Sequence, residues 1–307
     1  FPNTYDNSGP FIEITSPNLG DTSRYPFRRV RRRTDDVQED TYSLGFDLRY
    51  DLAGAEAFLK TGARYVTREK SWDRENDNFQ GANGSFLLSD VVGQGPDDFF
   101  DDRFTFGPVI DFPSAETIFR DTPERLRPNV QGTIVDSLVT DFEASEDVLS
   151  GYAMLNAVIG GVTVIAGARV EQTDAEYAAF DIQTDAGVFV GAPLRRGGTD
   201  YVNVLPSIHL RAEPIDNLVV RAAWSNTIGR PNYTDIVPRR QIDTDEVRPG
   251  VFRGSFSEGN PDLEPFESMN LDLSVEYYLT PAGILSFGAF YKDIDNPIFN
   301  RTIDQTN

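Results

Sequence analysis

Apolar and polar residues alternate along eight short stretches of the chain, each bounded by Gly, Pro, Asn or Asp. Successive side chains of a β-strand point to opposite faces, so alternation with a period of two predicts strands with one apolar and one polar face. Tyr, Phe, Val and Leu, which favour strands, dominate the apolar positions. The predicted strands are residues 41–50, 57–65, 148–157, 162–171, 202–213, 218–225, 270–278 and 284–292.

The polar faces of these strands carry charged residues. Within residues 41–50, Tyr42, Leu44 and Phe46 share one face, whereas Asp47 and Arg49 share the other. If the apolar faces contact lipid, the polar faces line the lumen of a barrel. On this basis the residues expected to face a lumen are Asp47, Arg49, Arg64, Arg169, His209, Arg211, Arg221, Asp272 and Glu276.

The connections between the strands are of two kinds. Tight turns, such as "PIDN" at 214–217, join the strands into hairpins, whereas long acidic loops are expected at 66–147, 172–201 and 226–268. Short turns at one end and long loops at the other are typical of outer-membrane barrels, with short periplasmic turns and long extracellular loops. We therefore predict an all-β fold, a transmembrane antiparallel β-barrel. An ordinary antiparallel sheet shows the same alternation, so it stays open at this point.

The acidic composition of the chain argues against some classes of partner. The chain has 28 Lys and Arg against 49 Asp and Glu, a formal net charge of −21. This disfavours nucleic acid, whose phosphates require a basic surface. The chain contains no Cys and only one His, His209, which excludes thiolate and His-rich metal sites. The sequence contains no apolar run of about 18 residues, so it predicts no transmembrane helix. We expect no catalytic residues, no metal and no cofactor.

Two short runs are the most specific motifs of the sequence. One is an S-x-T-I-x-R-P run whose arginine is Arg230, and the other is an N-P-x-L-x-P run that begins at Asn260. In this order and spacing they resemble the barrel of TonB-dependent outer-membrane receptors. The phrases "AGARVEQTD" (166–174) and "FYKDIDNPI" (290–298) are most similar to a subgroup often associated with oligosaccharide uptake, although siderophore receptors share the same barrel. The stretches that carry the resemblance are 39–65, 146–174, 205–238 and 259–298.

The resemblance implies a protein of the bacterial outer membrane, of which this chain is a part. The family's barrel has about 22 strands, encloses a plug domain and imports a scarce nutrient with energy passed on by the TonB complex. This sequence has about eight complete strands and lacks the plug and the C-terminal strands, so we expect residues 1–307 to be a partial barrel domain. Expected partners are outer-membrane lipid, the receptor's own plug domain, the TonB complex and a small nutrient ligand. An oligosaccharide is favoured slightly over a ferric siderophore.

The predicted loop at 230–256 mixes aromatic and charged residues. This mixture suits a sugar, which stacks on aromatic rings and hydrogen-bonds to charged groups, whereas an anionic ligand would use the arginines. A long loop that is solvated or packs on its neighbours explains the same composition. The candidate ligand contacts are Tyr233, Asp235, Arg239, Arg240, Phe252 and Arg253.

Several charged runs have both a functional and a structural interpretation. The basic run at 27–33 suits lipopolysaccharide phosphates or a solvated strand extension. The acidic clusters at 96–102 and 243–246 suit a hard cation or solvated loops. Within 114–126, Ser114 suits the cap of a short helix.

Ser207 and His209 share a strand face, as a nucleophile and its base would. No orienting acid accompanies them, so a lumen-facing polar pair is the better interpretation. Two other functions stay open. A soluble secreted all-β carbohydrate-binding module would bury the apolar faces on a second sheet. A closed eight-stranded barrel with an adhesive or enzymatic role would require shorter loops than 66–147.

Overall fold

A computed structural model describes residues 5–6, 13–14, 21–81, 86–95, 108–248, 251–279 and 282–302, with the backbone alone described for 5–6, 13–14 and Phe252. The chain divides into two compact units. The first unit comprises Phe1–Thr34 and Glu75–Asp136, and the second comprises Asp35–Arg74 and Ser137–Asn307. Each unit is described separately.

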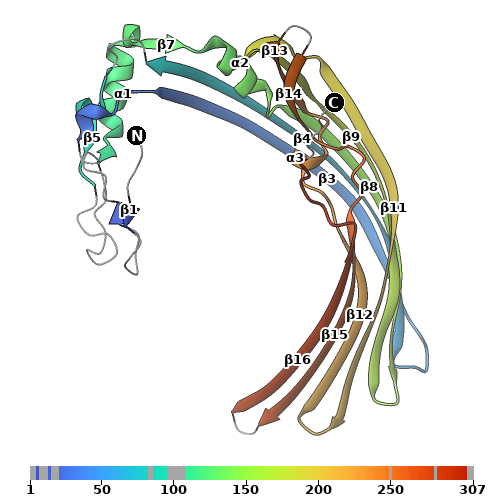
Figure 1. Cartoon of the computed structure of the whole chain (residues 1–307). Helices are drawn as coiled ribbons and strands as arrows, with labels where there is room; N and C mark the ends of the chain where they lie inside the picture. The colour runs from blue at the N-terminus through green and yellow to red at the C-terminus, as the bar shows by residue number, and fades with distance from the viewer. Residues whose placement is uncertain are drawn as a thin grey trace. The chain divides into compact units, whose positions relative to one another are not determined.

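The second unit is built on an antiparallel sheet, which confirms the predicted all-β fold (Figure 1). Its long strands follow the order β16-β15-β12-β11-β9-β8-β4-β3 and curve together side by side. Neighbours in the sheet are thus neighbours among the long strands of the sequence, as in an up-and-down barrel wall. β3 and β4 contribute residues to both units. The bounds are β3 Arg29–Asp51, β4 Ala57–Gly81, β8 Phe142–Ile159, β9 Val162–Asp185, β11 Leu194–Ile215, β12 Leu218–Gly229, β15 Phe266–Leu279 and β16 Gly283–Asp295.

The strands are longer than the alternation predicts. β9 runs on to Asp185 and β11 begins at Leu194, so the expected loop at 172–201 is wrong over most of its length. The expected loops at 66–147 and 226–268 are also partly strand. Polar residues occupy both faces of these extensions. On β9 the apolar positions nevertheless change phase, from Val164 and Ala166 at even numbers to Ala175 and Tyr177 at odd numbers, so apolar side chains move to the other face of the strand while the backbone pairing continues.

An apolar row crosses seven strands on one face of the sheet, which we call the outer face. Leu155 is 40% exposed and Tyr291 is 56% exposed. Large apolar side chains this exposed require an apolar environment outside the chain. Direct Cα partners along the row, from β4 to β16, are Leu59, Leu155, Ala166, Ile208, Trp224, Leu271 and Tyr291.

The outer face changes from apolar to acidic within two residues of strand length. Partners Tyr65, Leu149, Gln172 and Val202 form the last partly apolar row on β4, β8, β9 and β11. Two residues further along, three carboxylates that we call the aspartate row stand directly opposite one another. Like charges in direct opposition require screening by water, so the outer face is wet from here on. The aspartate row consists of Asp147, Asp174 and Asp200.

The core of the second unit lies on the opposite face, which we call the inner face. There α3 (Tyr233–Ile236) and the following Val237 cover alternate residues of β8 and β9. Val237 and Ala179 are each only 1% exposed. The core residues are Phe142, Ala144, Ala175, Tyr177, Ala179, Ile236 and Val237.

A hairpin follows α3 and extends the sheet. It consists of β13 (Arg240–Arg248) and β14 (Val251–Glu258), and β13 pairs in parallel with β9 through residues 240–244 and 181–185. We call residues 230–265 the inner segment; its core residues and β13 pack on the sheet, which agrees with the interpretation of a loop that packs on its neighbours.

The first unit contains the helices α1 (Phe112–Asp121) and α2 (Val130–Leu138). Asp111 caps α1, because its carboxylate accepts from the Ser114 N–H at 3.2 Å, so the prediction that Ser114 is the cap is wrong. Within the described ranges no helix has the length and apolar character needed to span a membrane. The remaining elements of the first unit are β1 Tyr5–Asp6, β2 Glu13–Ile14, η1 Thr22–Arg24, η2 Leu88–Asp90, β5 Val92–Gly93, β6 Val109–Ile110, η3 Pro123–Arg125 and β7 Leu126–Pro128, whereas β10 Val188–Gly191 lies in the second unit.

The basic run at 27–33 leads into β3 within the first unit. The Arg31 Nε donates to Asn78 at 2.9 Å, and its guanidinium also pairs with Asp136. The Arg32 Nε donates to Asp77 at 2.9 Å. Two of the arginines thus have acidic partners in the chain, which favours the interpretation as a strand extension.

Replacing Gly167 with Ala tests the packing of β9 against β8. A Cβ at Gly167 would lie 2.5 Å from the Ala153 carbonyl oxygen and 2.7 Å from the Met154 Cβ. We expect the variant to lose about 1–3 kcal/mol of unfolding free energy, because the strands must separate to admit the methyl group. Urea unfolding of the full-length protein in detergent measures this loss.

The matched control is Gly151→Ala on β8. Its nearest neighbour would be the Gly62 carbonyl oxygen at 3.8 Å, so we expect a change within about 0.5 kcal/mol, since no close contact forms. Equal destabilisation by the two substitutions would contradict the close approach at Gly167.

Candidate functional site

Arg230 begins the inner segment and lies among charged side chains on the inner face. Its Nη2 donates to Oε2 of Glu171 at 2.9 Å and to Oγ1 of Thr173 at 3.2 Å. The Arg169 Nε donates to the other oxygen of Glu171 at 2.6 Å. The Glu171 side chain is only 12% exposed. The S-x-T-I-x-R-P run therefore places a guanidinium at the end of β12, where it pairs with a largely buried carboxylate of β9.

Glu146 of β8 extends these contacts towards β4. Its carboxylate lies 3.7 Å from the Arg230 Nε and 3.7 Å from the Arg68 Nη1. A cavity of about 50 Å³ lies among these groups, which is room for an ordered water between them. Burial raises the pKa of Tyr177 well above its ordinary value, and the charge of Glu146 adds to the effect. We call Arg68, Glu146, Arg169, Glu171 and Arg230 the inner charge cluster.

A second ion pair joins the hairpin to the sheet. The Arg240 Nε donates to Asp181 at 2.9 Å, and the Arg240 Nη2 donates to the other carboxylate oxygen. Asp181 is 4% exposed. The hydrogen bonds from Arg240 hold the pKa of Asp181 below its ordinary value, although burial acts in the opposite direction. The Thr184 hydroxyl adds a hydrogen bond to Asp243 of the hairpin at 2.7 Å.

The N-P-x-L-x-P run closes the inner segment against α3. The Asn260 N–H donates to the Asp235 carbonyl at 2.9 Å, and the Gly259 N–H donates to the Arg239 carbonyl at 3.0 Å. A Cβ at position 259 would lie 2.1 Å from the Val237 carbonyl oxygen, so the approach requires glycine. The two runs that carry the family resemblance are therefore adjacent parts of one structure.

Two of the candidate ligand contacts have partners within the chain. Tyr233 stacks on Phe142 with ring centroids 6.1 Å apart, and the Lys70 ammonium lies 5.3 Å from the centre of its ring. Arg240 is bound to Asp181. These contacts favour structural roles for Tyr233 and Arg240.

The other candidates differ in their exposure. Asp235 is half-buried, and its carboxylate accepts from the Asn232 Nδ2 at 3.2 Å. Arg239 is half-buried, and Arg253 is exposed on β14. The side chain of Phe252 lies outside the described part of the chain. Arg253 is therefore the exposed cation among the candidates.

The residues expected to face a lumen lie on one face of the sheet, the inner face. Arg211 is the Cα partner of Arg221, whose Nη1 lies 2.8 Å from the Glu276 Oε1. The Tyr152 hydroxyl donates to Asp47. That this face borders a lumen stays a prediction. The residues that share the inner face are Asp47, Arg49, Arg64, Arg169, His209, Arg211, Arg221, Asp272 and Glu276.

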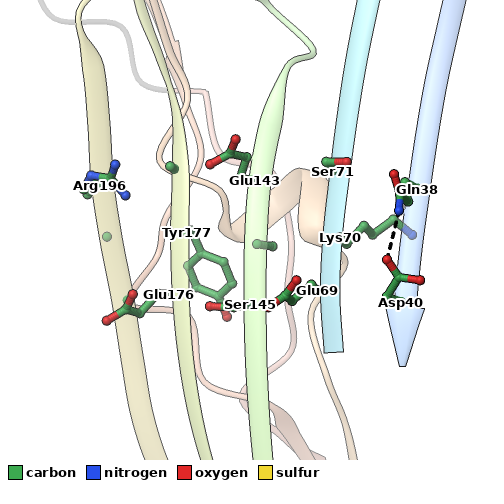
Figure 2. A pocket seen from close by; sticks show the side chains of 14 residues that line it. Gln38, Asp40, Glu69, Lys70, Ser71, Glu143, Ser145, Glu176, Tyr177 and Arg196 are labelled. Carbon is green, nitrogen blue, oxygen red and sulfur yellow. Dashed lines mark hydrogen bonds between the residues drawn. The ribbon is translucent and has the colours of Figure 1, made fainter. Parts of the chain in front are cut away.

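A shallow depression of about 670 Å³ spans β3, β4, β8, β9 and β11 (Figure 2). Within it Glu69, Ser145 and Glu176 are direct partners on three strands. Glu143 stands opposite Ala178, which stands opposite Arg196. These residues lie on the outer face beyond the aspartate row, on the side of the sheet away from the inner charge cluster. None of the candidate ligand contacts whose side chains the structure describes lines this depression.

The sequence suggested two further kinds of site. No group of three or more His, Cys, Asp or Glu side chains suited to a metal ion occurs in the part of the chain that the structure describes. The acidic stretch at 243–246 lies in β13, and the stretch at 96–102 lies outside the described residues. The Cα partners of His209 are Ala223 and Ile165, so neither of its direct partners is a carboxylate.

Sequence reasoning did not single out Glu146, Glu171 or Asp181. Arg230 was noted only as part of a motif. The spacing along the strands could have indicated two of them, because Glu146 and Glu171 each lie an even number of residues from inner-face residues of the same strand.

Comparison with protein families gives a match over residues 1–307 to "TonB dependent receptor-like, beta-barrel". A comparison with curated proteins found no match. Among solved structures, the ferric citrate transporter FecA in its unliganded form is 12% identical, with a TM-score of 0.48. The match covers 88% of this chain and 29% of that one.

Two other solved structures give similar values. The siderophore receptor PiuA from Acinetobacter baumannii is 11% identical, with a TM-score of 0.35. The match covers 86% of this chain and 39% of the PiuA chain. The ferric-catecholate import receptor Fiu from E. coli K12 is 13% identical with a TM-score of 0.40, and covers 85% and 41%. The chain thus spans less than half the length of these proteins. They give no support to the subgroup associated with oligosaccharide uptake, and at such low identity their ligands say nothing about the ligand here.

Lowering the pH tests the ion pair between Asp181 and Arg240. The pKa of Asp181 is depressed in the folded protein. The pair therefore contributes stability that is fully present above about pH 4, the ordinary aspartate range, and is lost as the pH falls through the lower folded-state pKa. We expect amide exchange in residues 240–244 to accelerate over this acidic range. Hydrogen–deuterium exchange of the full-length protein, corrected for the intrinsic pH dependence, measures it.

Asp181→Asn provides the control for this titration. The variant has no carboxylate to titrate at this position, so the acid-dependent acceleration in residues 240–244 should disappear. An acceleration of the same size in the variant would assign the titration to another group.

Proposed function

Because the chain belongs to the TonB-dependent receptor-like β-barrel family, we propose that it forms part of the wall of a receptor that imports a scarce nutrient. The family is non-enzymatic and resides in the bacterial outer membrane. The outer face therefore contacts lipid, and its apolar row lies in the hydrocarbon region.

The observation that supports this function best is the contrast between the two faces. Side chains such as Leu155 and Tyr291 are exposed on the outer face, whereas arginines and carboxylates occupy the inner face of the same strands. A soluble carbohydrate-binding module would cover the apolar row with a second sheet of its own. Because the chain belongs to an outer-membrane family, we no longer favour the soluble module.

The inner-face residues receive a role under this proposal. We infer that they line the lumen and contact the receptor's own plug domain. The wall alone does not transport, because the proposed energy source, the TonB complex, acts through other parts of the full-length receptor.

For the ligand we favour an oligosaccharide slightly over a ferric siderophore. The net charge of −21 repels anionic ferric complexes, whereas it has little effect on the approach of a neutral sugar. The exposed Arg253 and the half-buried Arg239 supply hydrogen-bond donors that suit either ligand. A ferric siderophore is therefore the second candidate.

Direct binding to the purified full-length receptor separates the two ligand classes. The probes are malto-, xylo- and chito-oligosaccharides on one side and ferric citrate, a ferric catecholate and a ferric hydroxamate on the other. Saturable binding of an oligosaccharide by calorimetry would support the first class. Binding of an iron complex alone, together with induction by iron starvation, would overturn the preference for sugar. Binding of none of the probes would oppose both candidates.

Arg253→Ala tests the hairpin as a ligand contact. Removing a charged hydrogen-bond donor from the contact should weaken binding of the bound probe by about ten- to a hundredfold, because such bonds contribute about 1.5–3 kcal/mol. Stability should not change, since Arg253 is exposed. Calorimetric titration and urea unfolding measure the two effects.

The matched control is Arg196→Ala, which removes the same charge from an exposed position on the outer face. It should bind the probe as the parent does. Equal weakening by both substitutions would show an effect of net charge and would remove Arg253 from the contact.

A further inference from the structure

We propose that residues 230–244 and 254–265 of the inner segment are a fixed lining of the wall and not a lid, and that any response to ligand is confined to the tip of the hairpin between Thr244 and Gly254. The statement about ligand response rests on the proposed receptor function. The attachment of the segment to the sheet does not depend on which ligand binds.

Burial is the first reason. Ile236 and Val237 are 4% and 1% exposed, and they pack against Ala175 and Ala179, which are 3% and 1% exposed. Lifting the segment would expose both sides of this core to water. A loop that opens and closes is expected to have few buried apolar contacts, and this one forms the core of its unit.

Two ion pairs fasten the segment at separate points. Arg230 pairs with Glu171 at its start, and Arg240 pairs with Asp181 in its middle. The side chains of Glu171 and Asp181 are 12% and 5% exposed. If the segment moved away, each carboxylate would lose an arginine while staying largely buried, which is strongly unfavourable.

Backbone hydrogen bonds fasten the rest. Residues 240–244 pair with β14 on one side and with β9 on the other. At the end of the segment, Gly259 and Asn260 donate to the carbonyls of Arg239 and Asp235. The close approach of Gly259 to Val237 leaves no room for a side chain. The segment is thus held at its start, in its middle and at its end.

The distal hairpin differs from the rest of the segment. The pairing of β13 with β9 ends at Thr244 opposite Asp185. Beyond it Asp245 and Arg253 pair only across the hairpin in the described register, and both are exposed. The boundary between fixed and responsive chain is therefore expected between Thr244 and Asp245.

Hydrogen–deuterium exchange of the unmodified full-length receptor tests the boundary without a variant. We expect the amides of residues 233–244 to exchange at least about tenfold more slowly than those of 245–253, because they open only with the wall. Addition of any probe that binds, from the sugar and iron-complex panel, should change the rates in 245–253 alone. Fast exchange throughout 233–253 in the free receptor would overturn the proposal.

A disulfide between the segment and the wall gives the functional test. Ile242 and Gln183 are Cα partners on β13 and β9, and the chain has no Cys of its own. We expect the I242C/Q183C receptor to cross-link in intact cells and to bind its probe with the same Kd when oxidised or reduced. Loss of binding on oxidation, restored by a reductant, would show that the segment has to move.

The control pair is Q241C/S257C, whose disulfide joins β13 to β14 and makes no cross-link to β9, although Gln241 also pairs with Ile182 of β9. It should cross-link and bind equally in both states, and loss of binding in this pair as well would assign the effect to the hairpin itself. If the parent receptor binds none of the probes, the proposed nutrient classes fail while the exchange experiment still decides whether the lining is fixed. The two failures are therefore distinguishable.

Discussion

The antiparallel hydrogen-bond ladder is the constraint on which the rest of this structure depends. Hydrocarbon offers no partner to a backbone N–H or C=O, so a wall in lipid has to satisfy these groups between its own strands. The ladder from β4 to β16 does so, and its pairing fixes which side chains share a face. Once the register is set, apolar side chains face lipid and charged ones face inwards. The ion pairs, the core and the aspartate row all follow from that sorting.

The best-packed part of the second unit is nevertheless not the lipid-facing wall but the inner segment folded against it. Lipid solvates the outer face, so that face needs no complementary packing from the chain. On the inner face water is the alternative, and there burial of Ile236 and Val237 is favourable. The charged groups beside them are paired because a buried carboxylate without a partner is costly. The S-x-T-I-x-R-P run supplies Arg230 to this arrangement, and Gly259, directly before the N-P-x-L-x-P run, permits its close approach to Val237.

The sequence predicted the membrane-level parts of the strands because lipid imposes alternation there, as in residues 162–171. It did not predict the continuation of β9 to Asp185, since the apolar positions change there to the inner face, where Ala175, Tyr177 and Ala179 belong to the core. The partners of Arg230 lay beyond sequence reasoning as well, because Glu171 is 59 residues away and only the fold brings them together. Composition alone favoured Tyr233 and Arg240 as ligand contacts. It does not distinguish an aromatic ring or guanidinium that serves packing from one that is available to a ligand.

The aspartate row has a consequence for the way the protein sits in its bilayer. Sinking the wall by two residues, about 7 Å of strand, would carry Asp147, Asp174 and Asp200 together into hydrocarbon. Each carboxylate would oppose this by up to about 1 kcal/mol, because the cost near the interface is smaller than at the middle of the bilayer. Rising by the same distance would bring apolar rows into water. The aspartate row and the apolar rows together therefore fix how deeply the wall inserts into the bilayer. A bilayer of unsuitable thickness has to thin or thicken around the wall.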